Sequence, residues 1–179
     1  CEGWTVHAVV AHVAYLSACT PVTLVREIAR ARGDWNVAAD RMAQRDTRWP
    51  VGTLVQVIRR NAARPFPIKG APEVGTVADV SLHTEDVRRP LGIEGSLDES
   101  QVRAIFHTLL EEPNGRFITP PQVLAGLRFE ATDLDWQHGD GSLVRGPAQP
   151  LALALGGRPT LDELSGDGVE ILRGRLADA

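Results

Sequence analysis

Three side chains that can bind a metal ion lie at helical spacing in the middle of the chain. Asp79, His83 and Asp86 stand at positions i, i+4 and i+7 within residues 77–92. Because an α-helix advances by about 100° per residue, a helix over this segment places all three on one stripe. Two such ligands one turn apart need one more from elsewhere to make a metal site with an open coordination position. We expect His12, which lies in an apolar segment, to be that third ligand.

Two imidazoles and one carboxylate favour zinc or another borderline divalent ion. A low-molecular-weight thiol that coordinates such an ion loses its proton and becomes a strong nucleophile at neutral pH. Asp86 is then expected to act beyond the ligands, by orienting one of them or by accepting a proton. The open positions of such a site would admit water or a substrate thiol, so the ligand set is compatible with thiol chemistry at a metal ion.

Each of these residues also has a purely structural interpretation. Thr76 and Asp79 fit the capping pattern S/T-x-x-D/E, so Asp79 can equally well cap a helix. His83 and Asp86 can form a hydrogen-bonded pair on the surface. His12 can be a core histidine whose ring nitrogen is bonded to a backbone carbonyl. The residue types and spacing alone leave both interpretations open.

Arg88 and Arg89 fall in the last turn of the expected helix, where cations suit the helix dipole, and Pro90 ends it. They can hold anionic groups of a bound cofactor or substrate, or they can be solvated charge. His107 and His138 have no helical partner at ligand spacing, and we interpret both as structural or surface residues.

Apolar residues at helical spacing predict an all-helical first half. The expected helices cover residues 6–16, 21–32, 34–45, 54–63 and 77–89, and Thr5 and Thr53 are the expected caps of the first and fourth. Residues 64–72 carry three prolines and a glycine, which indicates a loop.

After residues 91–96, which contain two glycines, the pattern changes, so we expect domains at 1–94 and 95–179. Capping boxes are expected at Ser96 with Glu99 and at Thr160 with Glu163. A helical stripe covers residues 102–110, residues 127–131 alternate as in a strand, and residues 143–144 suggest a short return strand. With an apolar run at 150–155 and a final helix at 169–176, the fold class is α+β.

Composition excludes several classes of protein. A net charge of −4 and a pI near 5.7 argue against a nucleic-acid partner. No apolar run approaches the roughly 20 residues of a membrane span. Two cysteines are too few for a disulfide framework, so we expect a cytoplasmic protein. There is no glycine-rich phosphate loop, no G-x-S-x-G elbow and no C-x-x-C pair.

Four separated motifs occur in one order along nearly the whole chain. They read C-E-G-W-T-V-H-A-V-V-A-H-V-A (1–14), D-V-S-L-H-T-E-D-V-R-R-P-L-G (79–92), R-F-E-A-T-D-L-D-W (128–136) and L-A-L-A-L-G-G-R (151–158). Together they resemble the mycothiol-dependent maleylpyruvate isomerase family. The resemblance implies an N-terminal helical bundle of the DinB type followed by a small sterol-carrier-like α+β domain.

The resemblance also implies a divalent metal, usually zinc, held by a histidine of the first motif and by a carboxylate and a histidine four residues apart in the second. Those positions are His12, Asp79 and His83, although the carboxylate of the family is often the longer Glu. The C-terminal domain of the family contributes an arginine near the substrate, and Arg158 is the positional candidate here.

For an isomerase of this family, mycothiol bound as thiolate adds to the double bond of a cis-dienoic diacid, the new single bond rotates, and the thiolate leaves. Arg88, Arg89 or Arg158 would hold the carboxylates. One alternative is a mycothiol S-transferase that conjugates electrophiles. Another is a metal-stabilised binding module without turnover.

Members of the family carry a further bundle helix before the first motif, whereas this chain begins at the motif, so the first bundle helix is expected to be missing. An apolar groove would then be exposed, which another copy of the chain could fill as a homodimer.

Overall fold

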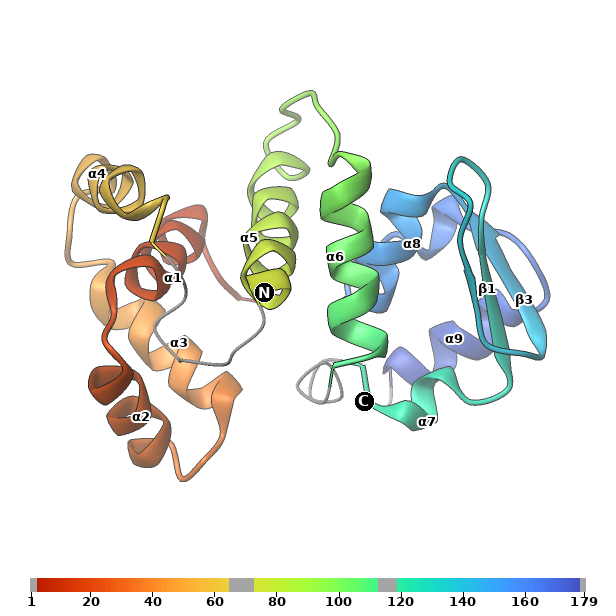
Figure 1. Ribbon diagram of the computed structural model, residues 1–179, viewed down its shortest axis with the longest axis horizontal. Coiled ribbons are helices and arrows are strands. Elements are labelled where there is room, and N and C mark those ends of the chain that lie inside the picture. Colours follow the sequence, from red (N-terminus) through yellow and green to blue (C-terminus); the bar gives the residue numbers. More distant parts are fainter. Residues whose placement is uncertain (1–2, 65–72, 113–118, 178–179) are drawn as a thin grey trace. The chain divides into compact units, whose positions relative to one another are not determined.

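The computed structural model describes residues 3–64, 73–112 and 119–177. These residues form a mostly helical α+β structure with one three-stranded sheet (Figure 1). The chain divides into two compact units, Cys1–Thr76 with His83–Ile93 and Val77–Leu82 with Glu94–Ala179. Helix α5 (Glu73–Arg88) is continuous and contributes residues to both units.

The first unit contains α1 (Val6–Ala18), α2 (Pro21–Arg30), α3 (Trp35–Asp46) and α4 (Val51–Asn61) besides its part of α5. Thr5 caps α1 as predicted, and its Oγ1 accepts a hydrogen bond from the N–H of Ala8 at 3.2 Å. The predicted start of α4 is wrong, because the helix begins directly after Pro50. Thr53 therefore lies inside the first turn and is not the cap.

Helix α5 begins no later than Glu73, three residues before Thr76. Asp79 therefore lies inside the helix, and the interpretation of Thr76 and Asp79 as an N-terminal capping box is wrong. The helix ends at Arg88, one residue before its predicted end at Arg89 and two before Pro90. Gly92 follows with φ 62°, and the next N–H, that of Ile93, donates to the carbonyl of Arg88 at 3.0 Å.

Helix α1 is the centre of the first unit. One hydrophobic cluster joins it to α2 and α3, and a second joins it to α4; their buried members are Leu24, Ala31, Ala38 and Met42 in the first and Ala11, Ala14 and Leu54 in the second. The alanines of α1 leave room for close helix contact. On α2, Leu24 is buried while Val22 and Val25 are 78% and 60% exposed, so its valines do not face the core.

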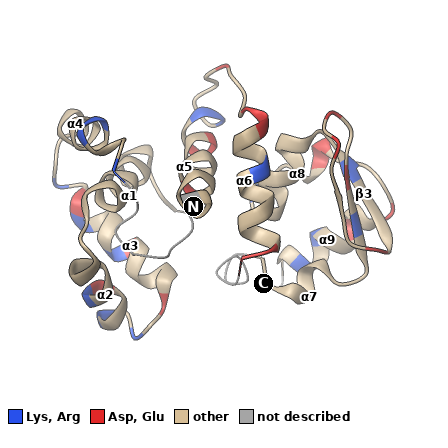
Figure 2. Ribbon diagram, viewed as in Figure 1, with Lys and Arg blue, Asp and Glu red and all other residues tan. Residues whose placement is uncertain are grey.

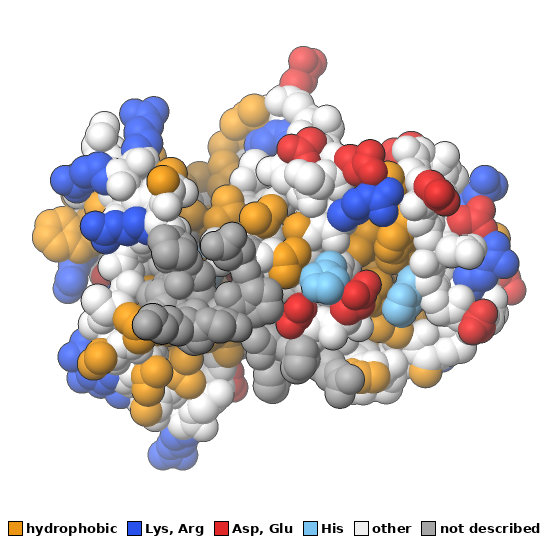
Figure 3. Space-filling model, in the orientation of Figure 1, with side chains coloured by type: hydrophobic (Ala, Val, Ile, Leu, Met, Phe, Trp, Pro, Cys, Tyr) orange, Lys and Arg blue, Asp and Glu red, His pale blue; other side chains and the backbone are white. Residues whose placement is uncertain are grey.

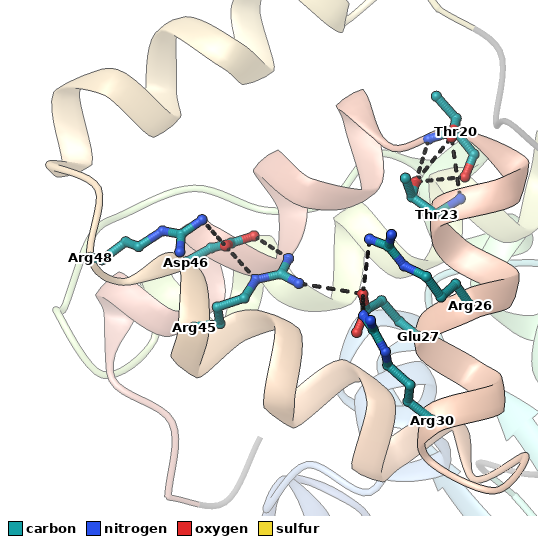
Figure 4. Close-up of polar contacts among 8 residues, drawn as sticks. All are labelled: Thr20, Thr23, Arg26, Glu27, Arg30, Arg45, Asp46 and Arg48. Carbon is teal, nitrogen blue, oxygen red and sulfur yellow. Dashed lines mark hydrogen bonds and ion pairs between the residues drawn. The ribbon is translucent and has the colours of Figure 1, made fainter.

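Two nearly buried carboxylates join α2 to α3 (Figure 4). Arg45 binds Asp46 with two hydrogen bonds of 2.8 and 2.9 Å and reaches Glu27 at 3.6 Å. Arg30 adds a 2.8 Å bond to Glu27. The hydrogen bond to Asp46 raises the pKa of Arg45, and its guanidinium lies 5.3 Å from the centre of the Tyr15 ring. Each buried charge is thus paired, as burial requires.

The second unit contains α6 (Glu99–Leu110), α7 (Pro121–Leu124), α8 (Ala148–Leu155), the 3₁₀ turn η2 (Leu161–Glu163), α9 (Gly168–Ala177) and the strands β1 (Leu127–Ala131), β2 (Gln137–His138) and β3 (Ser142–Gly146). Helix α8 is buried from Leu151 to Leu155. It contacts α6 on one side and the strands β1 and β3 on the other, as Figure 1 shows. Ala78 and Leu82 of α5 belong to the same core.

Both predicted capping boxes of this unit are wrong. Helix α6 is capped by Asp98, whose Oδ1 accepts the N–H of Gln101 at 2.9 Å while the Gln101 side chain accepts the N–H of Asp98. The hydroxyl of Ser100 and the N–H of Gln101 lower the pKa of Asp98. At the second site, the Thr160 hydroxyl donates to the carbonyl of Pro150 at 2.7 Å and does not cap η2.

Strand β1 has the predicted bounds, and its alternation buries Leu127, Phe129 and Ala131. The sheet has the order β2-β1-β3, with β2 antiparallel and β3 parallel to β1. The predicted return strand at 143–144 is therefore part of β3, which runs in the same direction as β1, and the antiparallel return is made by β2.

Acidic and basic residues are interspersed along the helices and strands of both units (Figure 2). Within residues 3–64, 73–112 and 119–177, no helix has both the length and the apolar character that a membrane crossing requires.

Candidate metal centre

His12 on α1 and Asp79 and His83 on α5 bring three possible ligand atoms within 4.8 Å of one another. These are the three residues that the sequence singled out. Ligand atoms bound to one tetrahedral zinc at about 2.0–2.1 Å lie about 3.3 Å apart. Small side-chain rotations are therefore enough to bring the three atoms onto one ion.

The two histidines are buried, His12 being 2% and His83 9% exposed. Their ring centroids are 4.9 Å apart and the rings meet at 70°, edge to face. The helical repeat of α5 places Asp79 one turn before His83 on the same stripe. Each ligand therefore comes from a regular helix, which limits how far its side chain can move.

Asp86 extends the group by one hydrogen bond. Its Oδ2 lies 2.9 Å from Nδ1 of His83, and both side chains are 10% exposed. The two residues are thus a nearly buried pair and not the surface pair that the sequence also allowed. An ionised carboxylate only accepts hydrogen bonds, so Nδ1 carries the proton and Nε2 keeps the lone pair that a metal needs. This carboxylate–histidine pairing is common behind metal ligands.

The donor set fits a divalent ion of the zinc type. Two neutral imidazoles and one carboxylate are ligands that such ions take, and three protein ligands are usual where a coordination position stays open. Among the residues that the structure describes, the group comprises His12, Asp79 and His83 and no fourth Cys, His, Asp or Glu.

The two arginines at the end of α5 lie in different surroundings. Arg88 donates to Oε1 of Glu85, whose side chain is only 1% exposed, whereas the side chain of Arg88 is 15% exposed. Arg89 is exposed. Sequence reasoning did not single out Glu85, although a carboxylate three residues before an arginine on a helix is a recognisable pairing signal.

Arg158 lies in the second unit, beyond the end of α8. Its Nη1 donates to the carbonyl of Gly156 at 2.5 Å. A Cβ atom on Gly156 would lie 3.0 Å from Cδ2 of Leu82 and 3.1 Å from Nη1 of Arg158. The guanidinium of Arg158 and the side chain of Leu82, which directly precedes His83 on α5, therefore both pack against this glycine.

Sequence reasoning missed Trp4 and Asp40 as residues of this centre. The indole of Trp4 lies beside both imidazoles, with ring centroids 5.2 Å from His12 and 6.1 Å from His83. Its Nε1 donates to Oδ1 of Asp40 on α3 at 3.0 Å. Trp4 directly precedes the predicted cap of α1, so the sequence already placed it next to the helix that carries His12. No local pattern points to Asp40.

His107 and His138 lie outside the group of possible ligands. On the face shown in Figure 3, histidine side chains reach the surface beside acidic ones. His107 makes such contacts, with Glu111 at 2.9 Å and Glu112 at 3.2 Å, and the ring of His138 stacks on Trp136 at 6.3 Å. Both have the structural or surface surroundings that we expected.

Cys19 is not arranged as a nucleophile. Burial raises the pKa of its thiol, and Sγ donates to the carbonyl of Leu16 at 3.6 Å. Reactive thiols have a lowered pKa and a cationic neighbour. Cys1 lies outside the described residues.

Comparison of the chain with protein-family models, with curated proteins and with solved structures finds no match.

Proposed function

We propose that this chain is a metal-dependent enzyme that activates a low-molecular-weight thiol for attack on an electrophilic substrate. The observation that carries the proposal is the convergence of His12, Asp79 and His83 from two helices. Zinc is the metal we propose, and mycothiol, the thiol of the family that the motifs resemble, is the proposed cosubstrate.

A divalent ion at this place supplies a positive charge that lowers the pKa of a thiol bound beside it. The residues of the chain do the rest. His12 and His83 offer uncharged nitrogen donors, and Asp79 adds an anionic oxygen. Asp86 holds the ring of His83 in one orientation, and the low exposure of the histidines excludes water from their donor atoms.

The first reaction we propose is a cis–trans isomerisation. The thiolate sulfur adds to the activated double bond of a cis-dienoic diacid, the former double bond rotates as a single bond, and expulsion of the thiolate restores the double bond. In a thiol S-transferase, the carbon–sulfur bond formed by the attack would remain in the product. Both reactions need one activated sulfur, so the same centre serves either.

A diacid substrate needs a cation near the reacting carbon atoms. Arg158 is the arginine we propose for this role, since it packs against the glycine that Leu82 of α5 also contacts. Arg88 pairs with Glu85, and the exposed Arg89 is a second candidate for binding an anionic group of the thiol.

At the level of the fold, we propose that the helical first unit is a bundle of the DinB type and the second a sterol-carrier-like α+β domain. The rival function is a binding module with a structural metal ion. Structural sites usually have four protein ligands. Among the described residues the group has three donors, which supports the enzyme.

The test is cobalt substitution followed by addition of a thiol. Metal-free protein is titrated with Co²⁺, and the visible absorption is recorded before and after mycothiol is added. We expect one ion per chain and a new thiolate-to-cobalt band on adding the thiol. His12→Ala, Asp79→Ala and His83→Ala should lose the ion, whereas the control His107→Ala should keep it.

Cobalt binding that survives each of the three ligand substitutions would refute the centre itself. Cobalt binding without any spectral change on adding thiol would leave a metal site but refute the enzyme. Isomerase and transferase are then separated by the product: an isomerised diacid with free thiol, or a stable thioether.

A further inference from the structure

Trp4 forms a third ring in the candidate metal centre. The indole stacks almost parallel to His83, with an angle of 11° and centroids 6.1 Å apart, and meets His12 at 60° and 5.2 Å. Aromatic rings attract one another at centroid separations of about 4.5–7 Å. Because His12 and His83 also contact each other at 4.9 Å, each of the three rings touches the other two.

The position of Trp4 is held from both its backbone and its side chain. Gly3 before it has φ 77°, a conformation that favours glycine, and Thr5 after it caps α1. At the far end of the indole, Nε1 donates to Asp40 of α3 at 3.0 Å. The ring is therefore anchored to two helices of the first unit.

We propose that Trp4 is a positioning residue of the metal centre and that Asp40 is its anchor. The indole lies beside both imidazoles and so limits their rotation about the side-chain bonds. The possible ligand atoms already lie within 4.8 Å of one another, so each ring has only a small rotation left to make when an ion binds. A ring that is already oriented loses less conformational entropy on binding.

The inference rests on the proposed metal centre and extends it by two residues that do not bind the ion. Partners of this kind typically contribute a factor of about 10–100 to metal affinity. The hydrogen bond between Asp40 and Trp4 transmits the effect through the indole, so a change at Asp40 should act only while Trp4 is present.

The test measures Co²⁺ affinity by competition with a chelator, together with the visible cobalt spectrum, on the purified chain. Trp4→Ala should weaken binding about tenfold or more and change the shape of the cobalt bands, because the imidazoles settle in another geometry. Trp4→Phe keeps the stacking but lacks the N–H, so it should behave like Asp40→Ala. Both variants should lose less Co²⁺ affinity than Trp4→Ala. Asp40→Asn keeps an oxygen that can accept from the indole and should restore binding.

Two controls separate this role from general stability. Trp49→Ala removes another tryptophan of the first unit, which is 49% exposed, and should leave affinity and spectrum unchanged. The double variant Trp4→Phe with Asp40→Ala should lose no more affinity than either single variant, because both act through one hydrogen bond. Circular dichroism checks that each variant is folded, and Trp4→Phe and Asp40→Ala serve if Trp4→Ala is not.

Folded Trp4→Phe and Asp40→Ala that bind Co²⁺ with wild-type affinity and spectrum would overturn the inference. If His12→Ala loses the ion in the same experiment, the proposed metal centre stands and only the role of Trp4 falls. If His12→Ala binds as the wild type does, both fall.

Discussion

Removal of the Asp86 carboxylate should weaken metal binding without removing a ligand. In Asp86→Ala, Nδ1 of His83 loses the acceptor that lies 2.9 Å away in a pair with side chains only 10% exposed. Hydrogen bonds to charged groups contribute about 1.5–3 kcal/mol. Because about 1.4 kcal/mol is a factor of ten, the dissociation constant for Zn²⁺ should rise about 10- to 100-fold. In Asp86→Asn an uncharged oxygen can still accept, so the loss should be smaller.

The assay is a Zn²⁺ competition titration against a colorimetric chelator at one fixed pH. The matched control is Glu111→Ala, which breaks the hydrogen bond of His107 to a carboxylate at the same 2.9 Å distance on an exposed part of α6. That variant should bind Zn²⁺ as the wild type does, since His107 lies outside the group of possible ligands.

The reasoning would be refuted if Asp86→Ala bound Zn²⁺ with wild-type affinity while His83→Ala lost the ion. It would also be refuted if Glu111→Ala weakened binding as much as Asp86→Ala, because the effect would then not arise at the centre.

Two further predictions concern other parts of the chain. Gly156→Ala should change the thermal midpoint little, since φ is −79° and the two close contacts of the new Cβ, at 3.0 and 3.1 Å, are with side-chain ends of Leu82 and Arg158, while the Ala152 carbonyl oxygen lies at an ordinary 3.5 Å. The variant should raise the KM for a diacid substrate by displacing the guanidinium; a large loss of stability or an unchanged KM would contradict this. Cys19, studied in a Cys1→Ser background, should react with iodoacetamide more slowly than the unfolded chain at pH 8 and gain rate at higher pH, because burial raises its pKa and lowers the thiolate fraction; equal rates would contradict this.

Several patterns that depend only on near neighbours in the chain predicted the structure correctly. The cap at Thr5 and the two-residue alternation of β1 both appear in the structure with the expected partners or bounds. The stripe of Asp79, His83 and Asp86 follows from the helical repeat alone, and α5 covers it completely. Such features need no information from distant residues, since the geometry of one helix or strand determines them.

The capping box before α6 was predicted wrongly because two patterns competed there. Both Ser96 with Glu99 and Asp98 with Gln101 fit a capping box, and the second is formed. The choice follows from a distant contact: the N–H of Leu97 donates to the Gln149 side chain at 2.8 Å, so the chain at this point is held against α8.

The direction of β3 was predicted wrongly, and the core-facing side of α2 was not predicted, for a related reason. Alternation of side chains does not distinguish a parallel from an antiparallel neighbour, and helical spacing does not say which apolar face meets the core. The sheet partner and the packing of α2 on α3 decide both, and both depend on residues far along the chain.

For the candidate metal centre, too, one part could be predicted from the sequence and the other could not. The sequence by itself determined that Asp79 and His83 share one face of a helix, because the regular turn of an α-helix brings residues four apart onto the same side. Only the tertiary structure decided that His12 meets that face and that Trp4, tied to Asp40 36 residues away, lies beside both rings. Those contacts join separate helices, and their geometry comes from the packing of side chains in the core, which no local repeat specifies.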